Sequence, residues 1–288
     1  MSGRALEVLA TGPLCTVQDQ GRPGLAHLGV PRAGALDRPA ADLANRLVGN
    51  PSGAALLEVV LGGLEVRATA DTWVAVTGAP APVAVGGRSA APGRAERLPA
   101  GAVLRLGAPG AGVRSYVAVA GGIDVAPVLG SRSTDTLAGV GPPVLAPGQR
   151  LGLGPPAGPP APVEAPAVPP RGTPTGVLRV HPGPRLERLG PQAFAELCAT
   201  AYVVGAEADR VGLRLDGPPL TRADAGELPS EGMVLGSVQV PPSGRPVVFL
   251  ADHPPTGGYP VVAVVDPGDL WQCAQLRPGE PVRFTRAR

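Results

Sequence analysis

The stretch SVQVPPSGRPVVFLADHPPTGGYPVVAVV, residues 237–265, has the pattern that decides the fold. Short apolar runs alternate with bends rich in Gly and Pro, which predicts β-strands, here two strand pairs, joined by tight turns. Nearly all of its polar side chains stand at or beside those bends, namely Gln239, Arg245, Asp252, His253, Thr256 and Tyr259. Binding residues concentrate on loops that a rigid scaffold holds in place. The bends are therefore candidates for a site as well as for ordinary turns.

The composition of the whole chain agrees with this pattern. Its 288 residues include 42 Gly and 38 Pro, yet 44% are hydrophobic and fall in alternating runs. That combination favours a packed, turn-rich protein over a disordered one. The length leaves room for two domains that each bury a core. The sequence therefore predicts a mainly β fold with a few helices, divided into two β-rich modules.

A proline-rich segment marks the predicted boundary. Residues 156–175 have no apolar period, so we expect a linker or surface loop between an N-terminal module (1–155) and a C-terminal module (176–288). Residues 37–50, DRPAADLANRLVGN, predict an amphipathic helix capped by Asp37. Residues 191–201 predict a second helix, and residues 54–87 have the hairpin signature of an antiparallel meander.

Charge and targeting signals exclude several classes of protein. The net charge of +2 and the scattered basic residues argue against nucleic-acid binding. No run is long enough for a signal peptide or a membrane span, so we expect a cytoplasmic protein without a membrane partner. The three cysteines are far apart and lack metal-ligand spacing, which indicates neither a disulfide framework nor a zinc site.

All 25 basic residues are arginine. Without lysine, this sequence has no Walker A lysine, no Schiff-base amine and no attachment point for covalent biotin. Recognition of phosphate or carboxylate would have to rely on arginine, backbone N–H groups or a bound cation.

Two loops in the first half combine pinned backbones with chemically useful side chains. Residues 16–31, TVQDQGRPGLAHLGVP, contain Asp19, Arg22 and His27, which fit either a polar site or an Asx turn with a structural histidine. Residues 130–135, GSRSTD, contain Arg132 and Asp135, which could hold an anion or cap a turn.

The second half contributes three more candidates. Residues 207–212, EADRVG, favour an internal salt bridge that includes Arg210. In residues 228–233, LPSEGM, Glu231 either meets substrate or caps the next element, and no G-x-S-x-G surrounds any serine. In the opening stretch, TGGY permits close backbone approach beside Tyr259.

Taken together, several stretches resemble the biotin-dependent carboxyltransferase family over nearly the whole chain except the proline-rich middle. The resemblance is carried by residues 16–50, by LEVVLGGLEV (57–66), VAVTGA (74–79), YVAVAGGIDVAPVLGSRSTDT (116–136) and ADRVGLRL (208–215), and by residues 228–260 and AQLRPGE (274–280). It implies two cyclophilin-like β-barrel modules. It also implies a role as the C subunit of an ATP-hydrolysing 5-oxoprolinase, inactive alone, which opens the lactam of 5-oxoproline to L-glutamate with partner subunits A and B.

The resemblance also implies site residues and cofactors. The expected catalytic residues are Asp19, Arg22, Arg132 and Glu231. The expected substrate-binding residues are His27, Asp37, Gln239, Asp252, Thr256 and Tyr259. ATP with Mg²⁺ is expected in the assembled complex; a metal reaching this chain would have to find Asp19, Glu231 or Asp252. His253 is left out, because other family members have other residues there.

Two alternatives remain open. In the first, the chain is the carboxyltransferase half of a urea or amide carboxylase that uses biotin carried on another chain. In the second, the chain is a non-catalytic regulator that binds a related partner.

Overall fold

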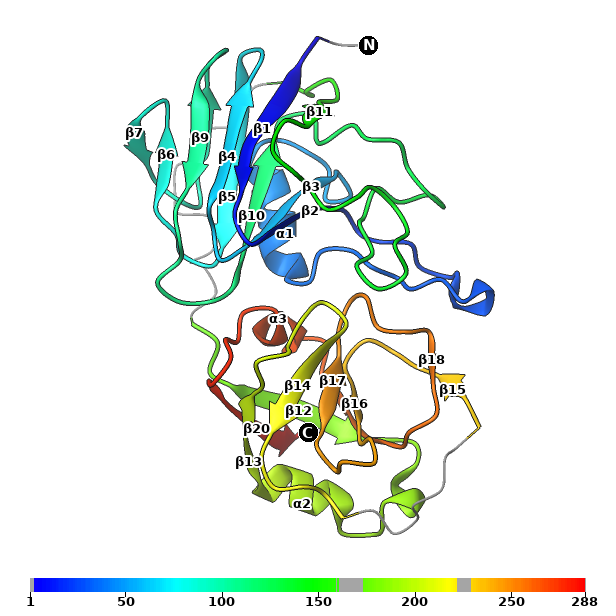
Figure 1. Ribbon diagram of the computed structural model, residues 1–288. Coiled ribbons are helices and arrows are strands. Elements are labelled where there is room, and N and C mark those ends of the chain that lie inside the picture. The colour runs from blue at the N-terminus through cyan, green and yellow to red at the C-terminus, as the bar shows by residue number, and fades with distance from the viewer. Residues whose placement is uncertain (1–2, 159, 161–172, 222–228, 288) are drawn as a thin grey trace. The chain divides into compact units, whose positions relative to one another are not determined.

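The computed structural model describes residues 3–158, 160, 173–221 and 229–287 (Figure 1). The chain forms two compact units, Met1–Arg22 with Ala33–Asp135 and Gly139–Thr173, and Pro23–Arg32 with Thr136–Ala138 and Pro174–Arg288. Two short segments from the first half, 23–32 and 136–138, thus belong to the second unit. The predicted linker 156–175 lies largely outside the described residues.

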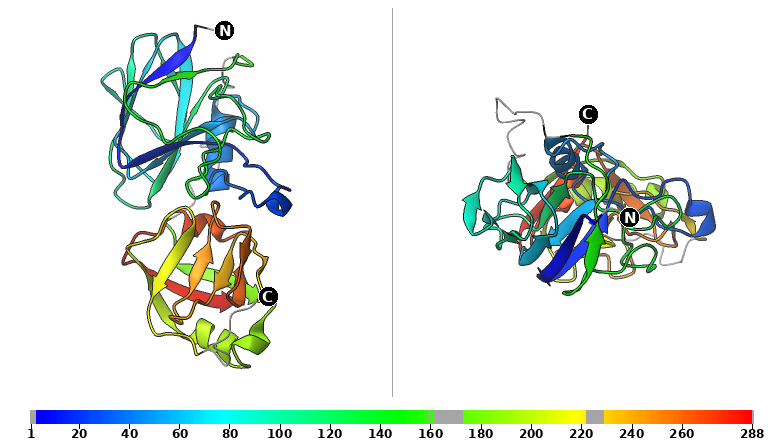
Figure 2. Two further views of the ribbon diagram at one scale, coloured as in Figure 1. Left: turned by 45° about the vertical axis from the view of Figure 1, so that its right-hand side comes forward. Right: turned by 90° about the horizontal axis from the view of Figure 1, so that it is seen from above.

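Unit 1 consists of two antiparallel sheets (Figure 1, Figure 2). The six-stranded sheet has the order β11-β1-β4-β9-β6-β7, with bounds β1 Ala5–Thr11, β4 Leu64–Ala68, β6 Val83–Val85, β7 Arg88–Ala90, β9 Val103–Leu106 and β11 Arg150–Gly152. The five-stranded sheet has the order β2-β3-β10-β5-β8, with bounds β2 Leu14–Gln18, β3 Leu56–Val60, β5 Thr72–Gly78, β8 Ala95–Leu98 and β10 Arg114–Val119.

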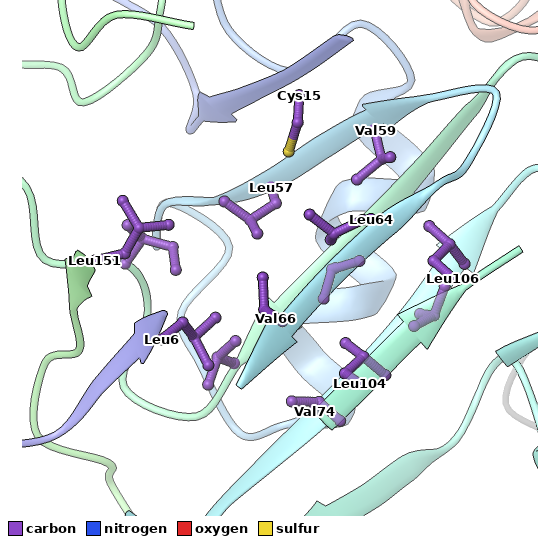
Figure 3. Close-up of a cluster of buried hydrophobic side chains, with 14 of the residues drawn as sticks. Leu6, Cys15, Leu57, Val59, Leu64, Val66, Val74, Leu104, Leu106 and Leu151 are labelled. Atoms are coloured by element: carbon purple, nitrogen blue, oxygen red, sulfur yellow. The ribbon is translucent and has the colours of Figure 1, made fainter. Parts of the chain in front are cut away.

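The main core of unit 1 takes side chains from both sheets (Figure 3). Successive strand residues point to opposite faces, so β10 serves two cores at once. Val117 and Val119 join the core that both sheets share. Tyr116 and Ala118 instead pack in a second cluster with residues of α1 (Arg38–Leu47). The five-stranded sheet is therefore buried on both faces at β10.

The first predicted helix is confirmed as α1. Asp37 precedes it, and its carboxylate accepts a hydrogen bond from the Ala40 N–H. A buried network attaches this end of the helix to the sheet: Glu58 accepts from the Tyr116 hydroxyl at 3.0 Å and from the Leu36 N–H at 3.0 Å. Burial raises the pKa of Tyr116 well above its ordinary value, so its hydroxyl stays a donor.

The predicted meander over residues 54–87 is wrong in its pairing. The strands are present, but β3 pairs with β2 and β10, whereas β4 pairs with β1 and β9 in the other sheet. The turn between them passes from one sheet to the other through Gly62 and Gly63, both with positive φ. A Cβ at Gly62 would lie 2.0 Å from the Gly107 carbonyl oxygen, so glycine is required there for space as well.

Unit 2 contains a closed barrel, which confirms the mainly β fold. The strand order is β12-β19-β16-β17-β14-β13-β20, with bounds β12 Val177–Pro182, β13 Ala201–Val204, β14 Gly212–Asp216, β16 Ser237–Gln239, β17 Val247–Phe249, β19 Val261–Val265 and β20 Pro281–Arg286. The helices are α2 Ala193–Ala199, which confirms the second prediction, and α3 Leu270–Cys273, with 3₁₀ turns η1 Ala26–Leu28 and η2 Leu186–Arg188. Among the described residues, no helix has the length and hydropathy of a membrane span.

The opening stretch forms one of its two expected strand pairs. β16 and β17 pair antiparallel across the PPSG bend. The second expected pair does not form, because β19 pairs with β16 and β12 and not with β18 (Thr256–Gly257), the strand before it in the chain. The short strand β18 pairs with β15 (Glu231–Gly232) and forms a separate two-stranded sheet beside the barrel (Figure 1). Residues 237–265 therefore contribute three strands to the barrel, β16, β17 and β19, and one strand, β18, to the small sheet.

Candidate functional site

The predicted site residues fall into three clusters, one in unit 1 and two in unit 2, with His27 and Asp37 outside them. We call them the Asp19 cluster (residues 18–22 and 130–135), the Asp252 cluster (Thr136, Arg210 and Asp252) and the β15–β18 edge (Arg185, Glu231, Gln239, Thr256, Gly257 and Tyr259). Each is built by hydrogen bonds within its own unit.

The Asp19 cluster joins the two candidate loops of the first half. Asp19 Oδ1 accepts from the Gly21 N–H at 2.8 Å and from the Ser131 and Ser133 hydroxyls at 2.6 Å each. Asp19 Oδ2 accepts from the Arg132 N–H at 2.6 Å. Three donors thus converge on Oδ1 and one reaches Oδ2, so both carboxylate oxygens are engaged. The carboxylate therefore clamps one loop to the other.

The two arginines of this cluster differ in exposure. Arg22 is 2% exposed and donates to the Ser133 carbonyl at 2.5 Å. The Arg132 side chain is 38% exposed and donates to the Val125 carbonyl at 2.7 Å and to Asp124 at 3.2 Å. Arg132 is thus the cation of this cluster that a ligand in solvent can reach.

Buried acceptors also remain in the Asp19 cluster. Gln18 is fully buried, and its Nε2 donates to the Thr16 hydroxyl and to the Thr134 carbonyl, each at 3.0 Å. Within the described part of the chain, Gln18 Oε1 and Thr134 Oγ1 are buried without a hydrogen bond. Buried polar atoms without a hydrogen bond lower the free energy of unfolding, so the interior between these two loops carries an energetic cost.

The Asp252 cluster is a buried ion pair in unit 2. Arg210 is 1% exposed and Asp252 is 0% exposed, and two parallel bonds of 2.9 Å join them. Thr136 adds its N–H at 2.9 Å and its hydroxyl at 2.7 Å to Asp252 Oδ2. Arg210 therefore takes part in a salt bridge, as predicted, with Asp252 as a partner 42 positions away. Glu207 lies 3.9 Å from Arg214. The bonds from Thr136 also explain why residues 136–138 belong to unit 2.

His253 follows directly in the chain. Its ring stacks on Phe249 with centroids 5.6 Å apart, and Nδ1 lies 2.8 Å from the Pro254 carbonyl. A carbonyl only accepts, so Nδ1 carries the proton. Burial lowers the pKa of His253, which keeps the imidazole neutral around pH 7.

The β15–β18 edge brings together four predicted residues. Glu231 stands opposite Gly257, next to the pair of Gly232 and Thr256. Gln239 Nε2 donates to the Tyr259 carbonyl at 3.3 Å. Arg185 was not among the predicted residues, yet it binds both carboxylate oxygens of Glu231 at 2.5–3.1 Å. That contact holds the pKa of Glu231 below its ordinary value, and no sequence signal links residues 46 positions apart.

Two predicted residues lie apart from these clusters. His27 is exposed on η1, with Nδ1 3.1 Å from the Gly24 carbonyl. Asp37 is 4% exposed and caps α1, so its carboxylate is already engaged. Their substrate-binding roles stay predictions.

Metal ligation and thiol chemistry find little support in these residues. The carboxylates of Asp19, Glu231 and Asp252 are each engaged by protein donors. The described residues include no group of three or more His, Cys, Asp or Glu that could hold a metal ion. Burial raises the pKa of both Cys15 and Cys273 to about 12, so these thiols stay protonated at pH 7.

Comparison with known proteins agrees with the fold. The family model for the carboxyltransferase domain, subdomains A and B, matches residues 28–286. The C subunit of 5-oxoprolinase from Escherichia coli (strain K12) is 37% identical over 284 residues, 98% of this chain and 91% of that protein. The urea amidolyase of Lachancea kluyveri is 31% identical over 97% of this chain and 17% of that protein.

Two solved structures have the same fold. The crystal structure of TTHA0988 superposes with a TM-score of 0.87 at 42% identity, over 99% of this chain. The Kluyveromyces lactis urea amidolyase superposes with a TM-score of 0.87 at 27% identity, also over 99% of this chain. This chain spans 56% of the first solved protein and 19% of the second. With matches of this extent in both sequence and structure, the chain belongs to the carboxyltransferase domain family with subdomains A and B.

Proposed function

We propose that this chain is the C subunit of an ATP-dependent 5-oxoprolinase. Together with subunits A and B, it opens the lactam of 5-oxoproline to L-glutamate. The observation that carries the proposal is the 37% identity to the Escherichia coli 5-oxoprolinase C subunit, over 98% of this chain and 91% of that protein. The Haemophilus influenzae 5-oxoprolinase C subunit supports it at 30% identity over 97% of this chain.

The reaction needs activation because an amide carbon is a poor electrophile. Transfer of the γ-phosphoryl group of ATP to the lactam oxygen releases ADP and makes that carbon reactive. Water then adds to the carbon, the ring C–N bond breaks, and the nitrogen takes a proton. A second water releases phosphate from the resulting acyl phosphate and leaves glutamate. ATP and Mg²⁺ act in the assembled, cytoplasmic complex, and their ligands are not assigned to this chain.

Arg132 is the residue of this chain that best fits charge stabilisation during phosphoryl transfer. Preorganised cations aimed at developing charge supply much of the catalysis in such reactions. Arg22 is buried and Arg210 is neutralised by Asp252, whereas the Arg132 side chain is 38% exposed. The Asp19 clamp fixes the backbone that carries Arg132.

Reconstitution tests the proposal. We expect purified chain, mixed with candidate subunits A and B, ATP, Mg²⁺ and 5-oxoproline, to form glutamate and ADP together. Omission of this chain or of ATP should abolish glutamate formation. The proposal is rejected when a stable complex of all three proteins forms no glutamate.

A carboxyltransferase role is the second candidate, favoured by the urea amidolyase and putative urea carboxylase relatives at 30–31% identity. Biotin would then arrive on another chain, since lysine is absent here. A turnover that requires a biotinylated carrier supports this role, whereas carrier-independent glutamate formation supports the first.

A further inference from the structure

Gln239 places a primary amide on an apolar outer face of the barrel. It lies at the end of β16, opposite Val247 on β17 and Val261 on β19. On this face Val261 forms an apolar cluster with Met233 and Phe249, against which Val247 packs. Gln239 is only 7% exposed. An amide in such surroundings costs folding free energy unless hydrogen bonds compensate for its desolvation.

The hydrogen bonds of Gln239 are incomplete. Among the described residues, its side chain makes a single hydrogen bond, the 3.3 Å contact from Nε2 to the Tyr259 carbonyl. Oε1 accepts no hydrogen bond from these residues and stays within reach of solvent. A primary amide offers two donors and two acceptor lone pairs. The second N–H has no acceptor among the described residues, and Oε1 is the atom of this amide that a ligand in solvent can reach.

The amide is nevertheless held in one orientation. Gly257 of β18 lies against it, and a Cβ at position 257 would come within 2.8 Å of Gln239 Nε2 and 3.3 Å of Met233. The φ of Gly257 is outside the left-handed region, so glycine is needed there for space and not for backbone conformation. The Tyr259 carbonyl and the Gly257 backbone thus fix an incompletely satisfied amide, as preorganised binding requires.

We propose that Gln239 binds the amide edge of the substrate, an inference that rests on the proposed function. A five-membered lactam carries its N–H and its carbonyl side by side on one edge. The substrate N–H donates to Gln239 Oε1, and the second N–H of Gln239 Nε2 donates to the substrate carbonyl. The ligand class is a small amide with this cis edge, which a lactam and urea share.

Discrimination between a lactam and a lactone tests the pairing. The probe is the lactone analogue of 5-oxoproline, in which oxygen replaces the ring N–H, used as a competitive inhibitor of the reconstituted complex. Facing lone pairs should make the complex bind the lactone at least about tenfold more weakly than 5-oxoproline. In Gln239→Leu the KM for 5-oxoproline should rise about tenfold. The ratio by which the complex binds 5-oxoproline more tightly than the lactone, which we call the lactam preference, should fall below about twofold. A preserved lactam preference in Gln239→Leu would overturn the inference.

Two glycines of the same small sheet provide a matched pair. Gly257→Ala pushes against the Gln239 amide and should weaken the lactam preference as Gln239→Leu does. Gly232→Ala, next to it across the pair of strands, has open space around the added Cβ and should leave KM and the preference unchanged. Equal behaviour of the two alanine variants would contradict the placement of the ligand at Gln239.

Stability of the isolated chain provides a test that needs no turnover. If Gln239 serves a ligand, Gln239→Leu replaces an incompletely satisfied amide with an apolar side chain among Val247, Val261 and Met233. The midpoint of thermal unfolding should then stay equal or rise. A fall of more than about 4 °C would show that Gln239 is a structural residue and would overturn the inference. A wild-type complex that forms no glutamate would reject the proposed function and leave this test intact.

Discussion

Asp252 and Gln239 lie in one stretch of the chain and are both buried, yet their hydrogen bonds differ sharply. Asp252 receives two bonds from Arg210 and two from Thr136, all of 2.7–2.9 Å. Among the residues that the structure describes, the Gln239 side chain makes one hydrogen bond, of 3.3 Å. Buried polar groups are normally satisfied, and an exception needs an explanation. The carboxylate of Asp252 is engaged by scaffold donors, whereas we propose that the Gln239 amide meets a ligand. The substrate-binding role expected for Asp252 stays a prediction.

The same difference is seen among the bends of residues 237–265. Polar side chains gather at these bends for two separate reasons. Asp252 uses its bend to tie Thr136, from the first half of the chain, to the barrel unit. Gln239 ends a barrel strand at the point where Gly257 leaves room for its amide.

Asp252→Asn should have the largest effect on the scaffold side. The substitution removes the charge that neutralises buried Arg210, and breaking such a pair costs about 3–5 kcal/mol. Urea denaturation of the isolated chain measures the free energy of unfolding. The exposed pair of Asp216 and Arg245 gives the control, since Asp216→Asn should change it by less than about 1 kcal/mol. Equal losses in both variants would contradict a scaffold role specific to Asp252.

Arg132→Ala extends the comparison of scaffold and ligand-binding residues to unit 1. Arg132 has a partly exposed side chain there and is expected to act in catalysis. Loss of its charge should lower kcat about 100-fold, roughly 2.7 kcal/mol of transition-state stabilisation, while the subunits still assemble. Steady-state kinetics and size-exclusion chromatography of the complex measure both. Arg105→Ala, which removes an exposed partner of Glu65 in the same unit, should leave kcat unchanged. Full turnover in Arg132→Ala would remove this residue from the site.

Asp19→Asn tests whether the Asp19 clamp behaves like Asp252. Asparagine has one acceptor oxygen where aspartate has two, so it cannot accept from the Arg132 N–H and from the three donors at Oδ1 together. The free energy of unfolding should therefore fall by about 1–3 kcal/mol. Chemical denaturation measures the loss, and Glu65→Gln on the exposed sheet surface serves as its control. An Asp19 variant with wild-type stability would argue that these bonds do not hold the loops together.

The smallest effect concerns the partly exposed pair of Arg185 and Glu231. Because Arg185 holds the pKa of Glu231 below its ordinary value, the pair stabilises the fold above the unfolded-state pKa of Glu231, 4.5. That contribution is lost as the pH falls from 4.5 through the lower folded-state pKa. Glu231→Gln should therefore flatten the acid side of the stability profile slightly. An unchanged acid limb would show that the contact contributes nothing in solution.

Local sequence signals predicted the local elements well. Asp37, Pro39 and the apolar spacing predicted α1, and alternating apolar runs predicted most strands. Strand partners could not be predicted as well. The Gly62–Gly63 turn joins strands of different sheets, and the alternation of apolar residues does not specify which strand pairs with which.

The chemical clusters depend on long-range contacts. Asp19 meets Ser131 112 positions away, Asp252 meets Thr136 116 positions away, and Glu231 meets Arg185 46 positions away. The sequence identified the residue types that matter in the loops. The partners that satisfy those residues depend on how the strands bring distant loops together.

A crystal structure of the assembled complex with 5-oxoproline tests the central claim most directly. We expect the ring nitrogen to lie about 2.9 Å from Gln239 Oε1. We also expect the carboxylates of Asp19 and Asp252 to keep their present protein donors. A ring nitrogen bound to either of these carboxylates, with Gln239 still bonded only to the Tyr259 carbonyl, would contradict the claim.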